Sequence, residues 1–138
     1  MAGFEEYGHA LASLALWGLM MVALSMISTR GRKPENRCDC GKPKRNYADP
    51  AYRRERAFMN AVETSPAFMA TTVAAMLSGA SPVSVNALAS IFLLSRIAMA
   101  VVHIRTENQP MRSAMFGIGW LVIILMALLS LWTIFIVA

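Results

Sequence analysis

The sequence predicts an all-α integral membrane protein, with four transmembrane helices in a single domain that covers residues 1–138. Long apolar stretches without charged side chains alternate with short polar segments. Only 15% of the residues are charged, whereas a typical soluble domain has about 25%. Ten of the thirteen Lys and Arg residues lie between Arg30 and Arg56. The small numbers of Cys, Gly and Pro, which are 2, 8 and 6, exclude a disulfide scaffold and a collagen-like chain.

The spans follow from the apolar runs in order along the chain. Residues 10–28 carry no charge, and at 1.5 Å per residue they are long enough to cross a hydrocarbon core of about 30 Å. Residues 64–94 are also free of charge but too long for one span. Gly79 and Pro82 lie in a Gly/Ser/Pro cluster that predicts a turn, so the run divides into spans 57–77 and 83–104. The fourth span is 114–138, which is charge-free throughout.

The basic residues predict the orientation. The segment 29–56 is strongly basic, the loop between the third and fourth spans holds Arg105 and Arg112, and the turn at 78–82 holds no basic residue. Short loops rich in Lys and Arg face the cytoplasm, so both termini are expected on the non-cytoplasmic side. The predicted location is a multi-pass membrane, the cell inner membrane if the source is bacterial. The lipid bilayer is the expected partner, and nucleic acid is not, because the basic segment adjoins two membrane spans.

Ionisable residues recur within the predicted spans, where charges are costly and indicate a functional site. Arg56, Asn60 and Glu63 are spaced by four and three residues, so they share one stripe of a helix. Arg96 and His103, seven residues apart, share a face of the third span. Glu63 and Arg96 lie about 10 Å and about 12 Å from the same membrane surface, at 1.5 Å per residue. Their matching depth predicts an ion pair between them.

The surplus of arginine over acidic residues indicates an anionic ligand, because unpaired guanidinium groups are costly to bury. The fourth helix is expected to begin near Pro110, with Arg112 and Ser113 in its first turn. A helix N-terminus favours an anion and lowers the pKa of a thiol held there. A purely structural role for these residues is the alternative interpretation. The predicted pair of Glu63 and Arg96 would then only fix helix register, and Arg112 would be a membrane anchor beside an ordinary Ser113.

Residues 53–63, Arg-Arg-Glu-Arg-Ala-Phe-Met-Asn-Ala-Val-Glu, resemble the R-A-x-x-N-x-x-E signature on the second helix of the MAPEG superfamily. This name stands for membrane-associated proteins in eicosanoid and glutathione metabolism. Arg96 followed by His103 resembles the third helix of that family, and Pro110-Met111-Arg112-Ser113 resembles the entry to its fourth helix. The spacing is most similar to the microsomal prostaglandin E synthase branch.

The resemblance implies a homotrimer of four-helix subunits that binds glutathione between neighbouring protomers, near the cytoplasmic face. It implies that Arg96 braces Glu63 and that Arg112 stabilises the thiolate with help from Ser113. No metal site is expected. The residues that the resemblance assigns to glutathione binding, with Arg30 as a looser match, are Arg30, Arg53, Arg56, Asn60, Glu63, Arg96 and His103, and the residues that it assigns to catalysis are Arg112 and Ser113.

Two positions depart from the family pattern. Members commonly have Tyr where His103 stands, and Tyr or His where Met99 stands. The resemblance therefore implies a transferase or peroxidase that acts on lipophilic electrophiles or hydroperoxides, rather than a specialised eicosanoid isomerase. Met99 and His103 favour an alternative, a non-catalytic MAPEG-fold membrane scaffold or an accessory subunit of a larger membrane complex.

Cys38 and Cys40 form a C-x-C motif in the basic segment. A structural zinc site needs about four ligands, and neither His lies in this segment. Because the segment is predicted to face a reducing compartment, a structural disulfide is not expected. We therefore expect two free thiols.

Overall fold

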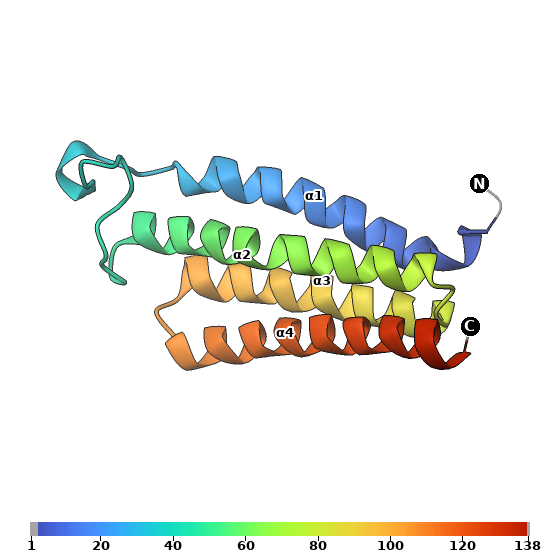
Figure 1. Ribbon diagram of the computed structural model, residues 1–138. Helices are drawn as coiled ribbons and strands as arrows, with labels where there is room; N and C mark the ends of the chain where they lie inside the picture. Colours follow the sequence, from blue (N-terminus) through green and yellow to red (C-terminus); the bar gives the residue numbers. More distant parts are fainter. Residues whose placement is uncertain (1–2, 138) are drawn as a thin grey trace.

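A computed structural model describes residues 3–137 as an all-α bundle of four long helices (Figure 1). They are α1 (Gly8–Ser28), α2 (Pro50–Leu77), α3 (Pro82–Arg105) and α4 (Gln109–Trp132). Short 3-10 turns cover Glu5–Tyr7 and Pro34–Asn36, and a π-helical turn, Thr133–Val137, continues α4. The predicted fold class is confirmed.

The two ends of the bundle differ in character. Figure 1 shows the N- and C-terminal ends together at one end of the bundle, with the loop between α1 and α2 at the other. The basic residues of the chain therefore gather at the loop end, where the connection between α3 and α4 also lies. The assignment of this end to the cytoplasmic side stays a prediction.

Local sequence explains where the helices begin. The turn between α2 and α3 contains Gly79 with φ +73°, a conformation that glycine adopts readily. The side chain of Asp49 accepts a hydrogen bond from the backbone N–H of Ala51 at 2.8 Å, and Pro50 occupies the first helical position. Because of this cap, α2 begins seven residues before the predicted span. Asn108 caps α4 in the same way, through the N–H of Met111 at 3.0 Å.

Three helical segments are long and apolar enough to cross a membrane, and they identify an integral membrane protein. They are Glu5–Ser28, Pro82–Arg105 and Gln109–Val137. α2 as a whole, which contains the second predicted span, lacks this apolar character. Four charged residues precede the span within α2, at positions 53–56, and inside the span Glu63, Pro66 and several Thr and Ser residues lower the apolar content. The passage of this span through the membrane stays a prediction. α2 and α3 nevertheless form the centre of the bundle, since each packs against all three other helices.

An aromatic cluster joins three helices at the middle of the core. Phe68 and Phe92 stack with ring centroids 3.8 Å apart, and Trp17 meets Phe92 edge-on at 5.2 Å. The indole N–H of Trp17 donates a hydrogen bond to Ser65 Oγ at 2.9 Å, so its one polar group is satisfied although the side chain is buried. This rigid centre fixes α1, α2 and α3 relative to one another and so positions the polar groups at the loop end.

Candidate functional site

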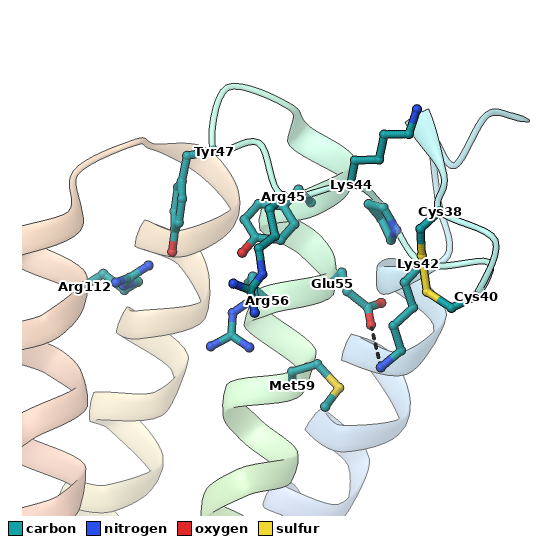
Figure 2. A pocket seen from close by; sticks show the side chains of 12 residues that line it. Cys38, Cys40, Lys42, Lys44, Arg45, Tyr47, Glu55, Arg56, Met59 and Arg112 are labelled. Carbon is teal, nitrogen blue, oxygen red and sulfur yellow. Dashed lines mark ion pairs between the residues drawn. A yellow bond between two sulfur atoms is a disulfide. The ribbon is translucent and has the colours of Figure 1, made fainter. Parts of the chain in front are cut away.

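Two adjoining cavities lie at the loop end of the bundle, and Arg56 and Arg112 line both of them. The smaller cavity, about 250 Å³, lies among α2, α3 and α4. The larger, about 750 Å³, lies between the helix ends and the loop that follows α1. Figure 2 shows Arg56 on α2 and Arg112 on α4, on facing sides of this space. The residues that line the smaller cavity are Arg56, Asn60, Glu63, Met99, Arg112, Ser113 and Phe116.

The predicted stripe on α2 faces the smaller cavity. Arg56, Asn60 and Glu63 all line it, as their spacing by four and three predicts. Arg56 Nη1 lies 3.7 Å from Glu63 Oε1, and both side chains are partly exposed. The structure therefore gives Glu63 a partner on its own helix, and the predicted ion pair between Glu63 and Arg96 is wrong for the single chain.

Arg96 lies behind the cavity wall rather than in the cavity. It is fully buried, and its Nη1 donates to Met99 Sδ at 3.3 Å. Its guanidinium carbon lies 5.0 Å from the ring centroid of Phe116 and 5.2 Å from that of Phe92, within the range of cation–π attraction. Nε and Nη2 have no hydrogen-bond partner among residues 3–137. Gly119 on α4 leaves room for this side chain, because a Cβ there would lie 2.6 Å from Nε.

Matching depth was a poor guide to the Arg96 partner because depth does not fix the direction in which a side chain leaves its helix. Arg96 points toward α4, where Phe116 and Gly119 surround it. Glu63 stands on the exposed side of α2. Met99 and Phe116 line the smaller cavity, and Arg96 contacts both from behind.

His103 holds two residues of the site in place. Its Nδ1 accepts a hydrogen bond from Asn60 Nδ2 at 3.4 Å, which leaves Nε2 to donate to the hydroxyl of Tyr47 at 3.0 Å. The ring is buried, with 1% exposed, and lies parallel to the Tyr47 ring. His103 therefore supports the wall of the cavity and lines neither of the two.

Tyr47 is a site residue that sequence reasoning missed. Its ring lies under the Arg112 guanidinium, 5.0 Å from the guanidinium carbon to the ring centroid. It meets Tyr52 edge-on at 5.5 Å. Because Tyr47 lies on a loop, no helical periodicity marks it. Its hydroxyl reaches the buried ring of His103.

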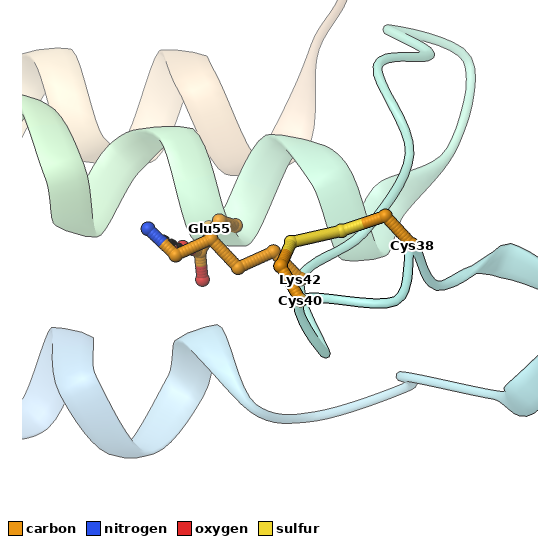
Figure 3. Close-up of a disulfide and its surroundings, with 4 residues drawn as sticks. All are labelled: Cys38, Cys40, Lys42 and Glu55. Atoms are coloured by element: carbon orange, nitrogen blue, oxygen red, sulfur yellow. Dashed lines mark ion pairs between the residues drawn. A yellow bond between two sulfur atoms is a disulfide. The ribbon is translucent and has the colours of Figure 1, made fainter.

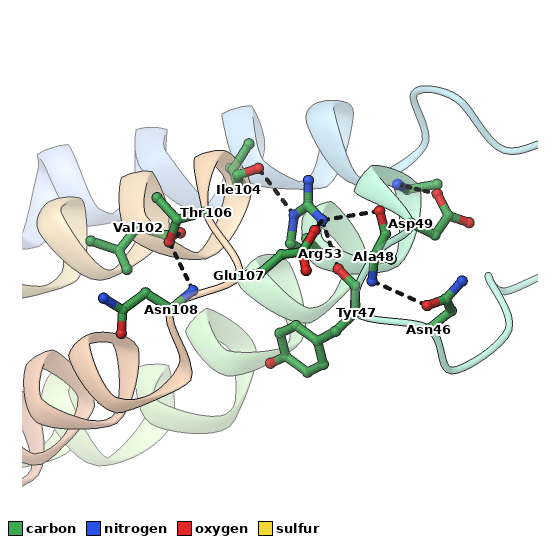
Figure 4. Close-up of polar contacts among 11 residues, drawn as sticks. Asn46, Tyr47, Ala48, Asp49, Arg53, Val102, Ile104, Thr106, Glu107 and Asn108 are labelled. Atoms are coloured by element: carbon green, nitrogen blue, oxygen red, sulfur yellow. Dashed lines mark hydrogen bonds and ion pairs between the residues drawn. The ribbon is translucent and has the colours of Figure 1, made fainter.

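Arg53 clamps the loop to the connection between α3 and α4 (Figure 4). Its Nη1 donates to the backbone carbonyls of Tyr47 at 2.6 Å and Ala48 at 3.1 Å. The same nitrogen lies 3.4 Å from Glu107 Oε1, and Nε donates to the carbonyl of Ile104 at 3.5 Å. Arg53 thus holds the loop that carries Tyr47, and it lines neither cavity.

Arg30 lies apart from the other predicted residues. It is exposed just after α1 and lines a third cavity of about 480 Å³, together with Arg54 and Arg105. Of the nine predicted site residues, the structure brings five together around the smaller cavity and leaves four outside it. The four outside are Arg30, Arg53, Arg96 and His103.

The larger cavity contains a disulfide, so the expectation of free thiols was wrong. Cys38 and Cys40 are bonded to each other with Cα atoms 5.2 Å apart (Figure 3). A tight hairpin brings them together: the N–H of Gly41 donates to the Cys38 carbonyl, and the N–H of Cys38 donates to the Lys42 carbonyl, both at 2.9 Å. Gly41 allows this turn through its φ of +78°. The spacing of two cysteines alone did not reveal the turn.

The electrostatics of both cavities suit an anionic ligand. Cationic side chains on the walls outnumber the two carboxylates, Glu55 and Glu63, and Glu55 is already paired with Arg32 and Lys42. The first turn of α4 adds the positive end of a helix dipole. Within residues 3–137, no group of three His, Cys, Asp or Glu residues could hold a metal ion. The cationic side chains are Lys42, Lys44, Arg45, Arg56 and Arg112.

Comparison with known proteins identifies the family. The model of the MAPEG family matches residues 8–132, which include all four helices of the bundle. No curated protein and no solved structure matches the chain. Because the match covers well over half of the sequence, the chain belongs to the MAPEG family.

Proposed function

We propose that this protein is a membrane-embedded transferase or peroxidase that uses glutathione against lipophilic electrophiles or hydroperoxides. Membership in the MAPEG family supports a glutathione-related function of this type at the family level. The observation that carries the proposal is one cavity in which Arg56, Asn60 and Glu63 of α2 face Arg112 and Ser113 of α4.

The donor set of this cavity fits the chemistry of glutathione. Glutathione carries two carboxylates, one ammonium group, two peptide bonds and a thiol. Arg56 and the cations of the larger cavity provide partners for the carboxylates. Glu63 is partly exposed and provides a carboxylate for the ammonium group. Asn60, held by His103, offers an amide to a peptide bond.

Arg112 and Ser113 are the residues proposed to act on the thiol. Both lie within the first five residues of α4, so the helix N-terminus and the guanidinium add their positive potential at one place. A positive environment lowers the pKa of a thiol and raises the thiolate fraction at neutral pH. The Ser113 hydroxyl donates a hydrogen bond to the same sulfur. The ring of Tyr47 beneath Arg112 restricts the directions that the guanidinium can take.

The lipophilic substrate enters from the bilayer along α4. Phe116 and Met99 form the apolar side of the smaller cavity, and large apolar residues on the outer face of α4, such as Trp120 and Leu121, are exposed. Arg30 lies outside both cavities of its own chain, so it contributes to glutathione binding only from a neighbouring protomer. A homotrimer provides such a neighbour.

The test is glutathione binding to detergent-purified protein, followed by the ultraviolet difference signal of the thiolate. We expect saturable binding with a thiolate signal. Arg112→Ala should keep most of the binding and lose the signal, because four other cations remain around the cavities. Arg105→Ala is the matched control, since Arg105 is an arginine at the same end of the bundle, the last residue of α3, but lines the third cavity. Full turnover by Arg112→Ala would refute the catalytic assignment.

A non-catalytic scaffold is the second candidate, and Met99 favours it. Its sulfur accepts from Arg96 Nη1, so this position offers no hydroxyl or imidazole donor to a ligand. This alternative predicts no glutathione binding in a well-folded protein. Met99→Tyr would then be expected to restore measurable affinity, whereas under the enzyme proposal the wild type already binds.

A further inference from the structure

The disulfide between Cys38 and Cys40 lines the cavity that adjoins the proposed glutathione site. Figures 2 and 3 show it on the hairpin beside Lys42 and Glu55. The larger cavity continues from the disulfide to Arg56 and Arg112, which also line the smaller cavity. A thiol held by these arginines therefore lies at one side of a space that has a disulfide at the other.

The position of the disulfide argues against a mainly structural role. It closes a loop with a sequence separation of 2, and short loops gain the least from cross-linking. The hairpin is already held by backbone hydrogen bonds around Cys38 and by an antiparallel bridge between Arg37 and Pro43. Both cysteines of the chain are used in this one bond.

The surroundings of the disulfide favour attack by a thiolate. Cys40 is exposed and Cys38 is half-buried, so Cys40 is the cysteine that we expect an incoming thiolate to attack. Lys42 and Arg45 line the same cavity, and positive charge both attracts an attacking thiolate and stabilises the thiolate that leaves. The nearby carboxylate of Glu55 is neutralised by Lys42 at 3.8 Å and by Arg32.

We propose that Cys38 and Cys40 form a redox couple that exchanges electrons with glutathione bound in the adjoining cavities. The thiolate of one glutathione attacks Cys40 Sγ, the bond between the two cysteine sulfurs breaks, and Cys38 leaves as a thiolate that takes up a proton. A second glutathione thiolate then attacks the sulfur of the first. Glutathione disulfide leaves, and Cys40 is protonated. Two glutathione thiols lose two electrons and two protons, which convert the protein disulfide into two thiols.

The experiment measures the rate of disulfide reduction in the detergent-purified full chain. A maleimide mass tag reports the reaction without ambiguity, because the chain has two cysteines in all. Glutathione is compared with 2-mercaptoethanol, which lacks carboxylates, at equal thiolate concentration. We expect the rate with glutathione to saturate and to exceed that with mercaptoethanol by about ten-fold, because bound reactants have a higher effective concentration. Equal, linear rates for both thiols would overturn the proposal.

Variants separate the cavity from the reactivity of the disulfide itself. Arg45→Gln should slow reduction by glutathione by about three-fold, through loss of one attracting charge. It should slow reduction by mercaptoethanol less, because that thiol has no carboxylates for Arg45 to hold. Arg105→Gln, outside the cavity, should change neither rate. An Arg45→Gln protein with wild-type rates for both thiols would contradict the role of the cavity. The variant Cys38→Ser should form a mixed disulfide with glutathione disulfide faster than Cys40→Ser does.

This inference depends on the proposed function for its thiol substrate, and a double variant separates the two. Cys38→Ser/Cys40→Ser should bind glutathione and give the thiolate signal as the wild type does. If it does so while the wild-type disulfide is reduced at equal, linear rates by both thiols, the redox couple is refuted and the proposed function stands. If reduction by glutathione saturates but no thiolate signal forms, the redox couple stands and the transferase fails. If no glutathione binds, both fail.

Discussion

The close approach of α4 to Arg96 makes a quantitative prediction about Gly119. A Cβ at this position would lie 2.6 Å from Arg96 Nε and 2.8 Å from its guanidinium carbon, both too short for carbon contacts. Arg96 is fully buried between aromatic rings, so it has little room to withdraw. Overpacking of this kind costs about 1–3 kcal/mol. We therefore expect Gly119→Ala to be destabilising.

Gly117→Ala is the matched control. Gly117 lies on the same helix, and no described heavy atom lies within 4 Å of the place its Cβ would take. Any gain in helix propensity is common to both variants, so their difference isolates the contact with Arg96. At about 4 °C per kcal/mol, Gly119→Ala should unfold about 4–12 °C below Gly117→Ala in detergent. Equal unfolding temperatures would refute the placement of Arg96 against α4.

A double-mutant comparison tests the same contact independently. Arg96→Met removes the guanidinium and replaces it with a shorter, flexible side chain. In that background the alanine at position 119 should cost less than it does in the wild type, because the atoms that it would meet are gone. Residues in contact show interaction energies of about 0.5–3 kcal/mol in such cycles. Additive effects of the two substitutions would contradict the contact.

Three further predictions concern the polar groups at the loop end. Tyr47→Phe removes the partner of His103 Nε2 and should cost about 1–3 kcal/mol in thermal unfolding, because the ring nitrogen is buried. Arg53→Gln breaks the clamp on the loop, so limited proteolysis should cut residues 29–49 faster than in the wild type. Glu63→Gln should lower the free energy of unfolding by less than about 1 kcal/mol, since the ion pair of Glu63 with Arg56 is partly exposed. A larger loss of thermal stability would indicate that this carboxylate has a buried partner instead.

Most of the fold could be predicted because membrane-spanning helices are visible in the sequence as long runs of apolar residues. The charge-free runs and the turn at Gly79 gave the number and order of the helices. The start of α2 was missed because its first two turns are rich in charge, and the cap formed by Asp49 and Pro50 lies inside what reads as a basic loop. Apolar content predicts the membrane span, but it does not indicate how far the helix continues beyond that span.

The candidate site was predictable where periodicity applies. Arg56, Asn60 and Glu63 share a face because their spacing requires it. The partner of Arg96 depended on the rotation of α3 relative to α2 and α4, and a single sequence does not contain that angle. Tyr47 and the cysteine disulfide lie on a loop, where backbone hydrogen bonds at particular residues decide the path. The periodicity of the sequence does not predict the path of such a loop.

The two guanidinium groups shared by the cavities make occupancy of one cavity depend on occupancy of the other. Arg56 and Arg112 border both spaces, so an anion in the larger cavity neutralises part of the potential that holds an anion in the smaller. By thermodynamic linkage the antagonism is reciprocal and equal in free energy. Small multivalent anions that bind in the larger cavity should therefore weaken the binding of an anion held in the smaller cavity, and added salt should weaken this competition along with the binding.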